Sequence, residues 1–252
     1  MIRSIAPGTE ISDISHLIRP LGVREGALVL AESVPYFPKS VHLAVIDPGV
    51  GSDRRAVIVS AAEGSLLVGP DNGLLMPSAA RLGGVEGAWE ITNAQLGLPH
   101  RSSTFHGRDI FAPAAAHLAK GVSPERFGPK VAVESLVRLP APAVRDLGAC
   151  LSGEVVQVDR FGNLQTSFTL ADLPDAMPLP GEVFELQVGG MAVQAAFRKS
   201  YAYGDPGELQ LVEDSHGSLA LCVNQGSAAG ALEGVGPGAT VLLGRPGFVV
   251  NG

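Results

Sequence analysis

The spacing of apolar residues changes near residue 140, and this change constrains the fold more than any other feature of the sequence. Before it, short apolar runs predict strands, and stretches with apolar residues at helical spacing predict helices. The predicted strands are residues 41–46, 56–60 and 65–68, and the predicted helices are residues 22–34 and 108–120. Continuous apolar strands alternating with helices are typical of a largely parallel sheet covered by helices on both faces. We therefore predict an α/β N-terminal domain over residues 1–142.

Beyond a proline-containing connection, the sequence predicts short strands separated by glycine-rich turns and requires no long helix. The predicted strands are residues 153–159, 183–188, 191–197, 207–212, 218–223 and 240–243. Such a series is typical of a small barrel or sandwich. We predict an all-β, barrel-like C-terminal domain over residues 150–252.

Charged residues make up only 17% of the chain, against about 25% in an ordinary soluble domain. A surface with so little charge leaves apolar area to cover, and burial between subunits would cover it, so we expect an oligomer. The net charge of −7 comes without a basic cluster. We therefore expect neither a nucleic acid nor an anionic membrane as a partner.

No apolar run reaches the roughly 18 residues of a membrane span, and the first twenty residues do not resemble a secretion signal. The two cysteines form no disulfide framework. These features together predict a cytoplasmic protein.

Four polar, glycine-rich clusters interrupt the predicted elements, and they are DPGVGSDRR (47–55), GPDNG (69–73), STFHGRD (103–109) and DRFGN (159–163). Ligands bind at the carboxyl ends of strands in open parallel sheets, so the first three clusters can converge there. Taken one at a time, each cluster is also an ordinary turn, and a single histidine before a helix is more often a cap or a satisfied core residue. Their joint occurrence at strand ends favours a binding site.

No metal or nucleotide-cofactor motif accompanies these clusters. The six histidines lack the spacing of metal ligands, and the two cysteines lie far apart. A P-loop, a GxGxxG turn after a strand and a GxSxG nucleophile elbow are all absent. We expect no metal and no cofactor.

The segments VHLAVIDPGVGSDRR, VGPDNG, STFHGRDIFAPAAAHLA and GEVVQVDRFGNLQTS, in this order, resemble the S-adenosylmethionine hydroxide adenosyltransferase family. The fluorinase and the chlorinase are relatives of that family. The resemblance runs from about Ser4 to Leu243. It implies hydrolysis of S-adenosylmethionine to adenosine and L-methionine. It also implies a homotrimer whose active sites lie between the first domain of one subunit and the second domain of its neighbour.

Carried over by position, the resemblance implies a water-handling triad of Asp47, Arg54 and His106, with the adjacent Arg55 as an alternative to Arg54. The implied substrate contacts are Asp71 and Asn72 in the first domain, and Asp159, Phe161, Asn163, Ser215, Val223 and Asn224 in the second.

These residue types suit attack by water or hydroxide on the ribose C5′ carbon. Methionine leaves a sulfonium as a neutral thioether, so the reaction needs an oriented water and an acceptor for its proton, but no general acid. Asp47 can accept a hydrogen bond from the water, and His106 can orient it or take its proton. A halide-using enzyme must instead strip water from its nucleophile, so these polar residues favour the hydrolase over the halogenase.

The chain departs from the family pattern at its start. Residues 1–8 match text that follows the family's first strand and most of its first helix, which carry the residues that hold the ribose. A start assigned too late, a shortened chain and a true deletion would each account for this. A non-catalytic trimer that binds S-adenosylmethionine or adenosine is therefore a second hypothesis.

Overall fold

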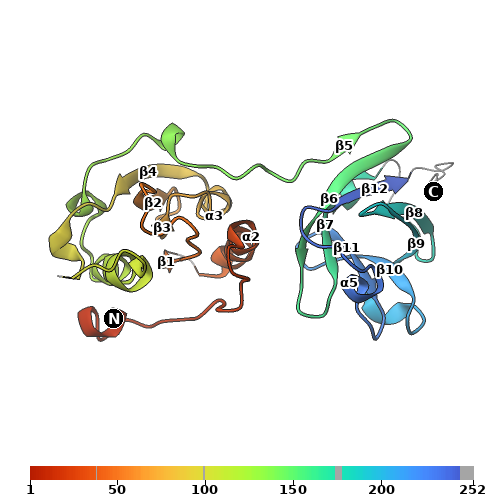
Figure 1. Cartoon of the computed structure of the whole chain (residues 1–252), viewed down its shortest axis with the longest axis horizontal. Coiled ribbons are helices and arrows are strands. Elements are labelled where there is room, and N and C mark those ends of the chain that lie inside the picture. Colours follow the sequence, from red (N-terminus) through yellow and green to blue (C-terminus); the bar gives the residue numbers. More distant parts are fainter. Residues whose placement is uncertain (38, 99, 174–177, 245–252) are drawn as a thin grey trace. The chain divides into compact units, whose positions relative to one another are not determined.

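The computed structural model describes residues 1–37, 39–98, 100–173 and 178–244, and the chain divides into two compact units, residues 1–140 and 141–252 (Figure 1). The first unit holds a four-stranded sheet with helices, and the second holds a closed barrel. Near the start of the second unit, β5 (Arg145–Asp146) pairs with the first barrel strand, within the stretch that the sequence predicts as a connection.

The sheet of the first unit contains β1 (Val41–Leu43), β2 (Ala56–Ala61), β3 (Leu66–Pro70) and β4 (Val85–Glu90), in the order β1-β3-β2-β4. Of its three pairings, only β1 with β3 is parallel. The prediction of a largely parallel sheet is therefore wrong for the described strands. The reason is the short connection between β2 and β3, where Gly64 has φ +97°. Parallel neighbours need a crossover of a dozen or more residues, whereas this turn forms an antiparallel hairpin.

The helices of the first unit are α1 (Ile2–Ile5), α2 (Val23–Ser33), α3 (Met76–Arg81), the π-helical turn η3 (Gly107–Phe111) and α4 (Ala112–Ala119). Short 3-10 turns are η1 (Val34–Tyr36), η2 (Ala94–Leu96), η4 (Pro124–Phe127) and η5 (Val133–Ser135). The two predicted helices are present, because α2 covers the first and η3 with α4 covers the second.

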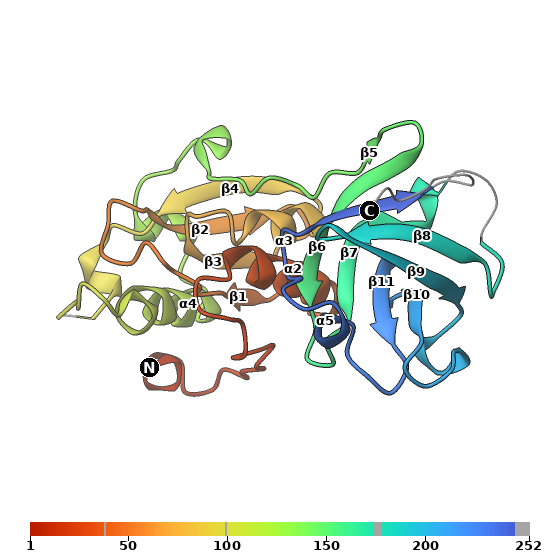
Figure 2. The ribbon, with the colours of Figure 1, turned by 45° about the vertical axis from the view of Figure 1, so that its right-hand side comes forward.

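Both faces of the sheet are buried beneath helices (Figure 2). Val57 and Val59 of β2 pack with α2 and α3 in one apolar cluster. Ala56 and Ile58, on the opposite face of the same strand, pack with α4 in another. This alternation follows from the period of two in a strand, and it confirms that helices cover the sheet on both sides.

The second unit is a barrel of seven strands in the order β12-β8-β9-β10-β11-β7-β6, which closes through the pairing of β12 with β6 (Figure 2). The strands are β6 (Cys150–Val158), β7 (Leu164–Thr169), β8 (Val183–Val188), β9 (Met191–Arg198), β10 (Leu209–Glu213), β11 (Ser218–Val223) and β12 (Thr240–Gly244). Short helical turns are η6 (Leu170–Asp172), η7 (Tyr201–Tyr203) and α5 (Ala228–Ala231). The barrel confirms the predicted all-β character of this part of the chain.

Closure of the barrel removes the exposed strand edges that an open sheet would carry. Its interior is filled by one apolar cluster, which includes Val155, Leu164, Phe168, Leu186 and Leu221. No helix among the described residues is long and apolar enough to cross a membrane.

Candidate active site

The DPGVG segment forms a loop that follows β1 after residues 44–46. The Ala44 amide donates to the Val68 carbonyl at 3.0 Å, which extends the pairing of β1 toward Asp47. The loop then turns through Val50, whose amide donates to the Asp47 carbonyl at 3.2 Å. Its compact form returns the chain so that Arg54 lies beside Asp47.

Asp47, Arg54 and His106 meet in one hydrogen-bonded group. Arg54 grips Asp47 with both arms of its guanidinium: Nε donates to Oδ1 at 3.0 Å, and Nη2 donates to Oδ2. The same Nη2 lies 3.0 Å from Nδ1 of His106. The side chains of Arg54 and Asp47 are only 8% and 6% exposed. Because the pair is largely removed from water, its geometry is held more firmly than that of a surface ion pair.

The contact between Arg54 and His106 determines which imidazole nitrogen carries the proton. A guanidinium can donate hydrogen bonds but cannot accept them. Nδ1 of His106 must therefore accept from Arg54, and the proton of the neutral ring is on Nε2. In this arrangement His106 presents an N–H donor at its other edge.

The second arginine of the pair has different partners. Arg55 donates from Nε and Nη2 to Oδ2 of Asp71 at 2.9 and 2.5 Å, and it also donates to the Ser135 carbonyl at 2.5 Å. The other oxygen of Asp71 accepts from the Val137 amide at 2.9 Å. Arg54 is thus the arginine beside Asp47, and Arg55 links Asp71 to Ser135 at the end of η5.

Asn72 uses its amide within the fold. Its Nδ2 donates to the Ile46 carbonyl at 2.8 Å, and its Oδ1 accepts from the Leu74 amide at 3.2 Å. Ile46 immediately precedes Asp47. Asn72 therefore fixes the backbone from which the Asp47 side chain projects.

Two glycines allow close packing around the triad. A Cβ on Gly51, where φ is +81°, would lie 2.6 Å from the Ser103 carbonyl oxygen. A Cβ on Gly26 of α2 would lie 1.9 Å from Cδ1 of Ile46. The loop that carries Asp47 can therefore approach both α2 and the segment before His106 because these positions have no side chain.

The DRFGN segment of the second unit is a tight turn between β6 and β7. Oδ1 of Asp159 accepts from the amides of Phe161 and Asn163 at 2.8 and 2.9 Å, and Oδ2 accepts from Nδ2 of Asn163 at 2.8 Å. Gly162 has φ +81°, and a Cβ there would lie 2.0 Å from Oγ of Ser227. These contacts hold the Phe161 ring outward, where the residue is 62% exposed and Arg160 stacks on it at 4.8 Å.

The remaining predicted substrate residues lie at the ends of β10 and β11. Ser215 is in the exposed turn between the two strands, 3.5 Å from Nδ1 of His216. Val223 ends β11 and packs on the barrel core. Asn224 follows it, and its Nδ2 donates to the Gly204 carbonyl at 2.7 Å.

Sequence reasoning assigned no role to two further residues near the triad. Phe111 lies beneath Arg54, with the guanidinium carbon 5.2 Å from the ring centre. Asp109 is fully buried and accepts hydrogen bonds from Arg108 and from the Ser102 amide. The sequence does carry a signal for Asp109, since an acidic residue next to an arginine comes directly before the apolar run IFAPAAA.

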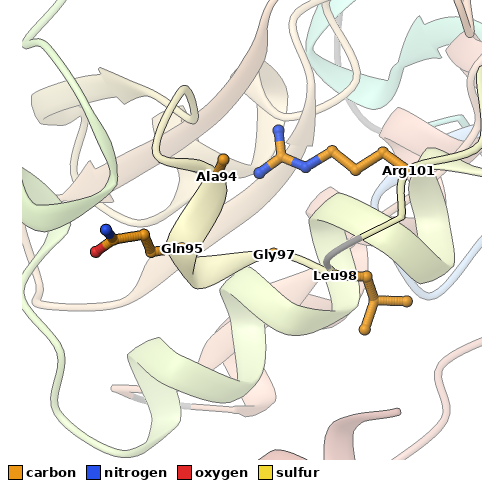
Figure 3. A pocket seen from close by; sticks show the side chains of 5 residues that line it. All are labelled: Ala94, Gln95, Gly97, Leu98 and Arg101. Atoms are coloured by element: carbon orange, nitrogen blue, oxygen red, sulfur yellow. The ribbon is translucent and has the colours of Figure 1, made fainter.

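Two other features lie apart from the triad. A shallow hollow of about 510 Å³ is lined by Ala94, Gln95, Gly97, Leu98 and Arg101, none of which is a predicted site residue (Figure 3).

Burial raises the pKa of Cys222 to about 12. This thiol is therefore unsuited to act as a nucleophile. No group of three or more potential metal-binding side chains occurs among the described residues.

Family models and individual relatives both connect the chain with proteins that act on S-adenosylmethionine. Residues 1–128 match the family model for the SAM hydroxide adenosyltransferase N-terminal domain, and residues 153–242 match the model for its C-terminal domain. The chain is similar to "(R)-S-adenosyl-L-methionine hydrolase" of Salinispora tropica, with 48% identity over 94% of this chain and 87% of the relative. The protein of the same name from Thermus thermophilus is 42% identical over 90% and 85%.

More distant relatives and a solved structure complete the comparison. A fluorinase of Actinopolyspora mzabensis is 27% identical over 91% of this chain and 85% of its own. The crystal structure of an uncharacterized conserved protein from Thermotoga maritima has a TM-score of 0.86 and 36% identity, and it covers 96% of this chain and 92% of that one.

Proposed function

The chain belongs to the SAM hydroxide adenosyltransferase family, and on this premise we propose that it is an enzyme that hydrolyses S-adenosyl-L-methionine to adenosine and L-methionine. The observation that carries the proposal is the buried Asp47–Arg54–His106 group in a chain 42–48% identical to proteins named as hydrolases of this substrate. Identity to the fluorinases is lower, at 27–29%, which favours water over a halide as the nucleophile.

The reaction forms a bond from the oxygen of water to the ribose C5′ carbon and breaks the bond from C5′ to the sulfonium sulfur. The electron pair of the broken bond stays on sulfur, so methionine leaves as a neutral thioether and one proton is released. Since the leaving group needs no proton, the reaction requires no general acid. We propose that Asp47 and His106 act on the water without a metal or cofactor. The enzyme contributes an oriented, partly desolvated water.

Each member of the triad has one role in this proposal. The water donates a hydrogen bond to the Asp47 carboxylate, which accepts its proton as the C–O bond forms. The Nε2–H of His106 donates to the water oxygen and directs a lone pair at C5′. Arg54 binds both Asp47 and His106 and fixes their positions relative to each other.

For the substrate contacts, we propose different roles for the two units. Phe161 supplies an exposed apolar surface, and Asp159 and Asn163 hold it in place and offer polar groups to the substrate. Ser215, Val223 and Asn224 contribute further contacts near methionine and adenine. Asp71 and Asn72 support the loop that carries Asp47 and do not bind the substrate directly, because their polar atoms already have partners within the protein. These partners are Arg55, Val137, Ile46 and Leu74.

We further propose a homotrimer in which the first unit of one subunit and the second unit of a neighbour build each site. The low charge content and the exposed rings of Phe105 and Phe161, which are 54% and 62% exposed, support burial between subunits. The two free cysteines suit a reducing compartment, so we propose the cytoplasm as its location.

Product analysis tests the function. The purified protein is incubated with S-adenosyl-L-methionine in chloride-containing buffer, and the products are separated by liquid chromatography beside those of Asp47→Asn. Adenosine and methionine in equal amounts, lost in the variant, are expected. A 5′-chloro product would identify a halogenase instead, and tight binding without turnover would favour the non-catalytic binder.

The names of the relatives specify the R form of the substrate. We propose that the present enzyme also prefers the R configuration, at the sulfonium sulfur of the substrate. Turnover of each sulfonium epimer, measured separately, is expected to be faster for the R form. Equal rates for both epimers would contradict this extension.

A further inference from the structure

A buried carboxylate lies three residues after His106, outside the triad. Asp109 is completely inaccessible to solvent. Its Oδ1 accepts from Nε of Arg108 at 2.5 Å, and its Oδ2 accepts from Nη2 of Arg108 at 3.0 Å and from the Ser102 amide at 2.7 Å. These hydrogen bonds hold the pKa of Asp109 below its ordinary value of 3.8, and the bond from Arg108 has the larger effect. A buried charge is tolerated because it is fully paired in this way.

The partners of Asp109 enclose the segment that carries His106. Ser102 lies at the start of this segment, and the Asp109 amide donates to the Phe105 carbonyl, at its end, at 3.1 Å. Arg108 also stacks on the exposed Phe105 ring at 4.7 Å. The carboxylate therefore holds the start of residues 102–106, and the backbone amide of the same residue holds their end.

The helix begins in an unusual way at this point. His106 immediately precedes η3, a π-helical turn over Gly107–Phe111, which then continues as α4. A π-turn accommodates one extra residue, and such turns occur frequently at functional sites. His106 has no side-chain capping bond to the turn, so its ring is free to bind Arg54.

We propose that Asp109 is a positioning residue for His106. Its carboxylate binds Ser102 and Arg108 rather than a member of the triad, and it acts on His106 through the backbone of residues 102–106. This inference rests on the proposed function for its kinetic readout alone. It predicts that Asp109 affects turnover through the orientation of the His106 ring rather than through substrate binding.

A double-mutant cycle tests the proposal. In Asp109→Asn, an amide N–H would face the donors of Ser102 or Arg108, so the loop should shift. We expect kcat to fall by about tenfold or more, with KM changed less than about threefold. In a His106→Gln background the same substitution should change kcat less than about twofold. An equal loss in both backgrounds would overturn the proposal.

Two further variants keep the test decisive. Asp172→Asn is the control, because this carboxylate also accepts a backbone amide bond, from Thr169 at 2.7 Å, but it lies in the barrel, and it should leave kcat unchanged. If Asp109→Asn does not fold, Arg108→Gln removes the same guanidinium from a half-exposed position. It should lower kcat in the same direction, and an unchanged kcat would overturn the proposal.

A spectroscopic readout separates failure of this inference from failure of the proposed function. The imidazole nitrogens of His106, assigned by their loss in His106→Gln, should report protonated Nε2 in the parent protein and a changed tautomer ratio in Asp109→Asn. An unchanged spectrum would overturn the positioning role even in a protein that does not turn over the substrate. Absence of turnover alone would overturn only the function.

Discussion

Two adjacent arginines of the DPGVGSDRR segment have different structural roles, although the sequence does not distinguish them. Arg54 binds Asp47 and His106, whereas Arg55 binds Asp71 and Ser135. The direction of each side chain depends on how the loop after β1 turns. Residue type and spacing predict which residues surround the site, but the pairing requires the folded loop.

Substitution of the two arginines tests this division. Arg54→Lys loses the two-armed contact with Asp47 and the bond to His106, so we expect kcat for hydrolysis to fall by about 10²-fold or more. Arg55→Lys is the matched control: it should lower thermal stability but change kcat less than about fivefold, because Asp71 lies outside the triad. Steady-state kinetics and a melting curve of each variant measure the effects. A larger kinetic loss in Arg55→Lys would reverse the assignment.

Gly51 permits the close approach of the two loops that carry the triad. In Gly51→Ala, the positive φ and the 2.6 Å contact with the Ser103 carbonyl act together. Gly84→Ala is the control, since φ is +101° there but nothing lies near its Cβ. We expect about 1 kcal/mol of destabilisation in the control from the left-handed backbone, and more than that, with loss of turnover, in Gly51→Ala. Equal denaturation midpoints and turnover for the two variants would contradict this role for Gly51.

At the scale of elements, the apolar pattern predicts where strands and helices lie better than how they pair. α2 and the barrel strands β8, β9 and β11 fall where the sequence predicts them. Sequence reasoning missed β7, because its inward face includes the polar Thr166 and its outward face carries Gln165 and Ser167. The antiparallel pairing of β2 and β3 depends on a turn whose geometry the pattern of the strands does not reveal.

His42 of β1 makes stability depend on pH. Burial lowers its pKa below the ordinary value of 6.5, although the negative charge of Glu63 has a smaller effect in the other direction. Its Nε2 has no hydrogen-bond partner among the described residues. The unfolded chain therefore binds a proton at a higher pH than the folded chain does. Stability should fall as pH drops from above 6.5 through the lowered pKa of the folded state.

Denaturant unfolding at several pH values measures this dependence. We expect His42→Leu to flatten the fall in unfolding free energy over that range, because a leucine at this buried position does not titrate. His100→Leu, at an exposed position, should keep the slope of the parent protein. A slope unaltered by His42→Leu would show that other groups cause the dependence.

At the scale of the whole molecule, the chain consists of two units, each with its own apolar core. The first unit has one cluster on each face of its sheet, and the barrel encloses a third. The change in apolar spacing near residue 140 locates the junction between the units because it reflects two different ways of burying apolar area. The residues that the resemblance assigns to the site are divided between these units.

Limited proteolysis should detect the connection between the units. Arg138 and Arg145 are exposed and flank the proline-containing segment 140–142. Early tryptic cuts at these positions should leave two resistant fragments, identified by mass spectrometry, because each core remains intact. Early cuts at Arg81 of α3 or at Arg198 of β9, which lie inside the two units, would contradict the division.

The central claim is that the triad delivers water to the ribose C5′ carbon, and a single-turnover reaction in ¹⁸O-labelled water tests it most directly. The account predicts that the adenosine formed carries ¹⁸O at its 5′ hydroxyl and that methionine carries none, as determined by mass spectrometry of both products. Adenosine without the label, or a product in which another bond of the substrate is cleaved, would contradict it.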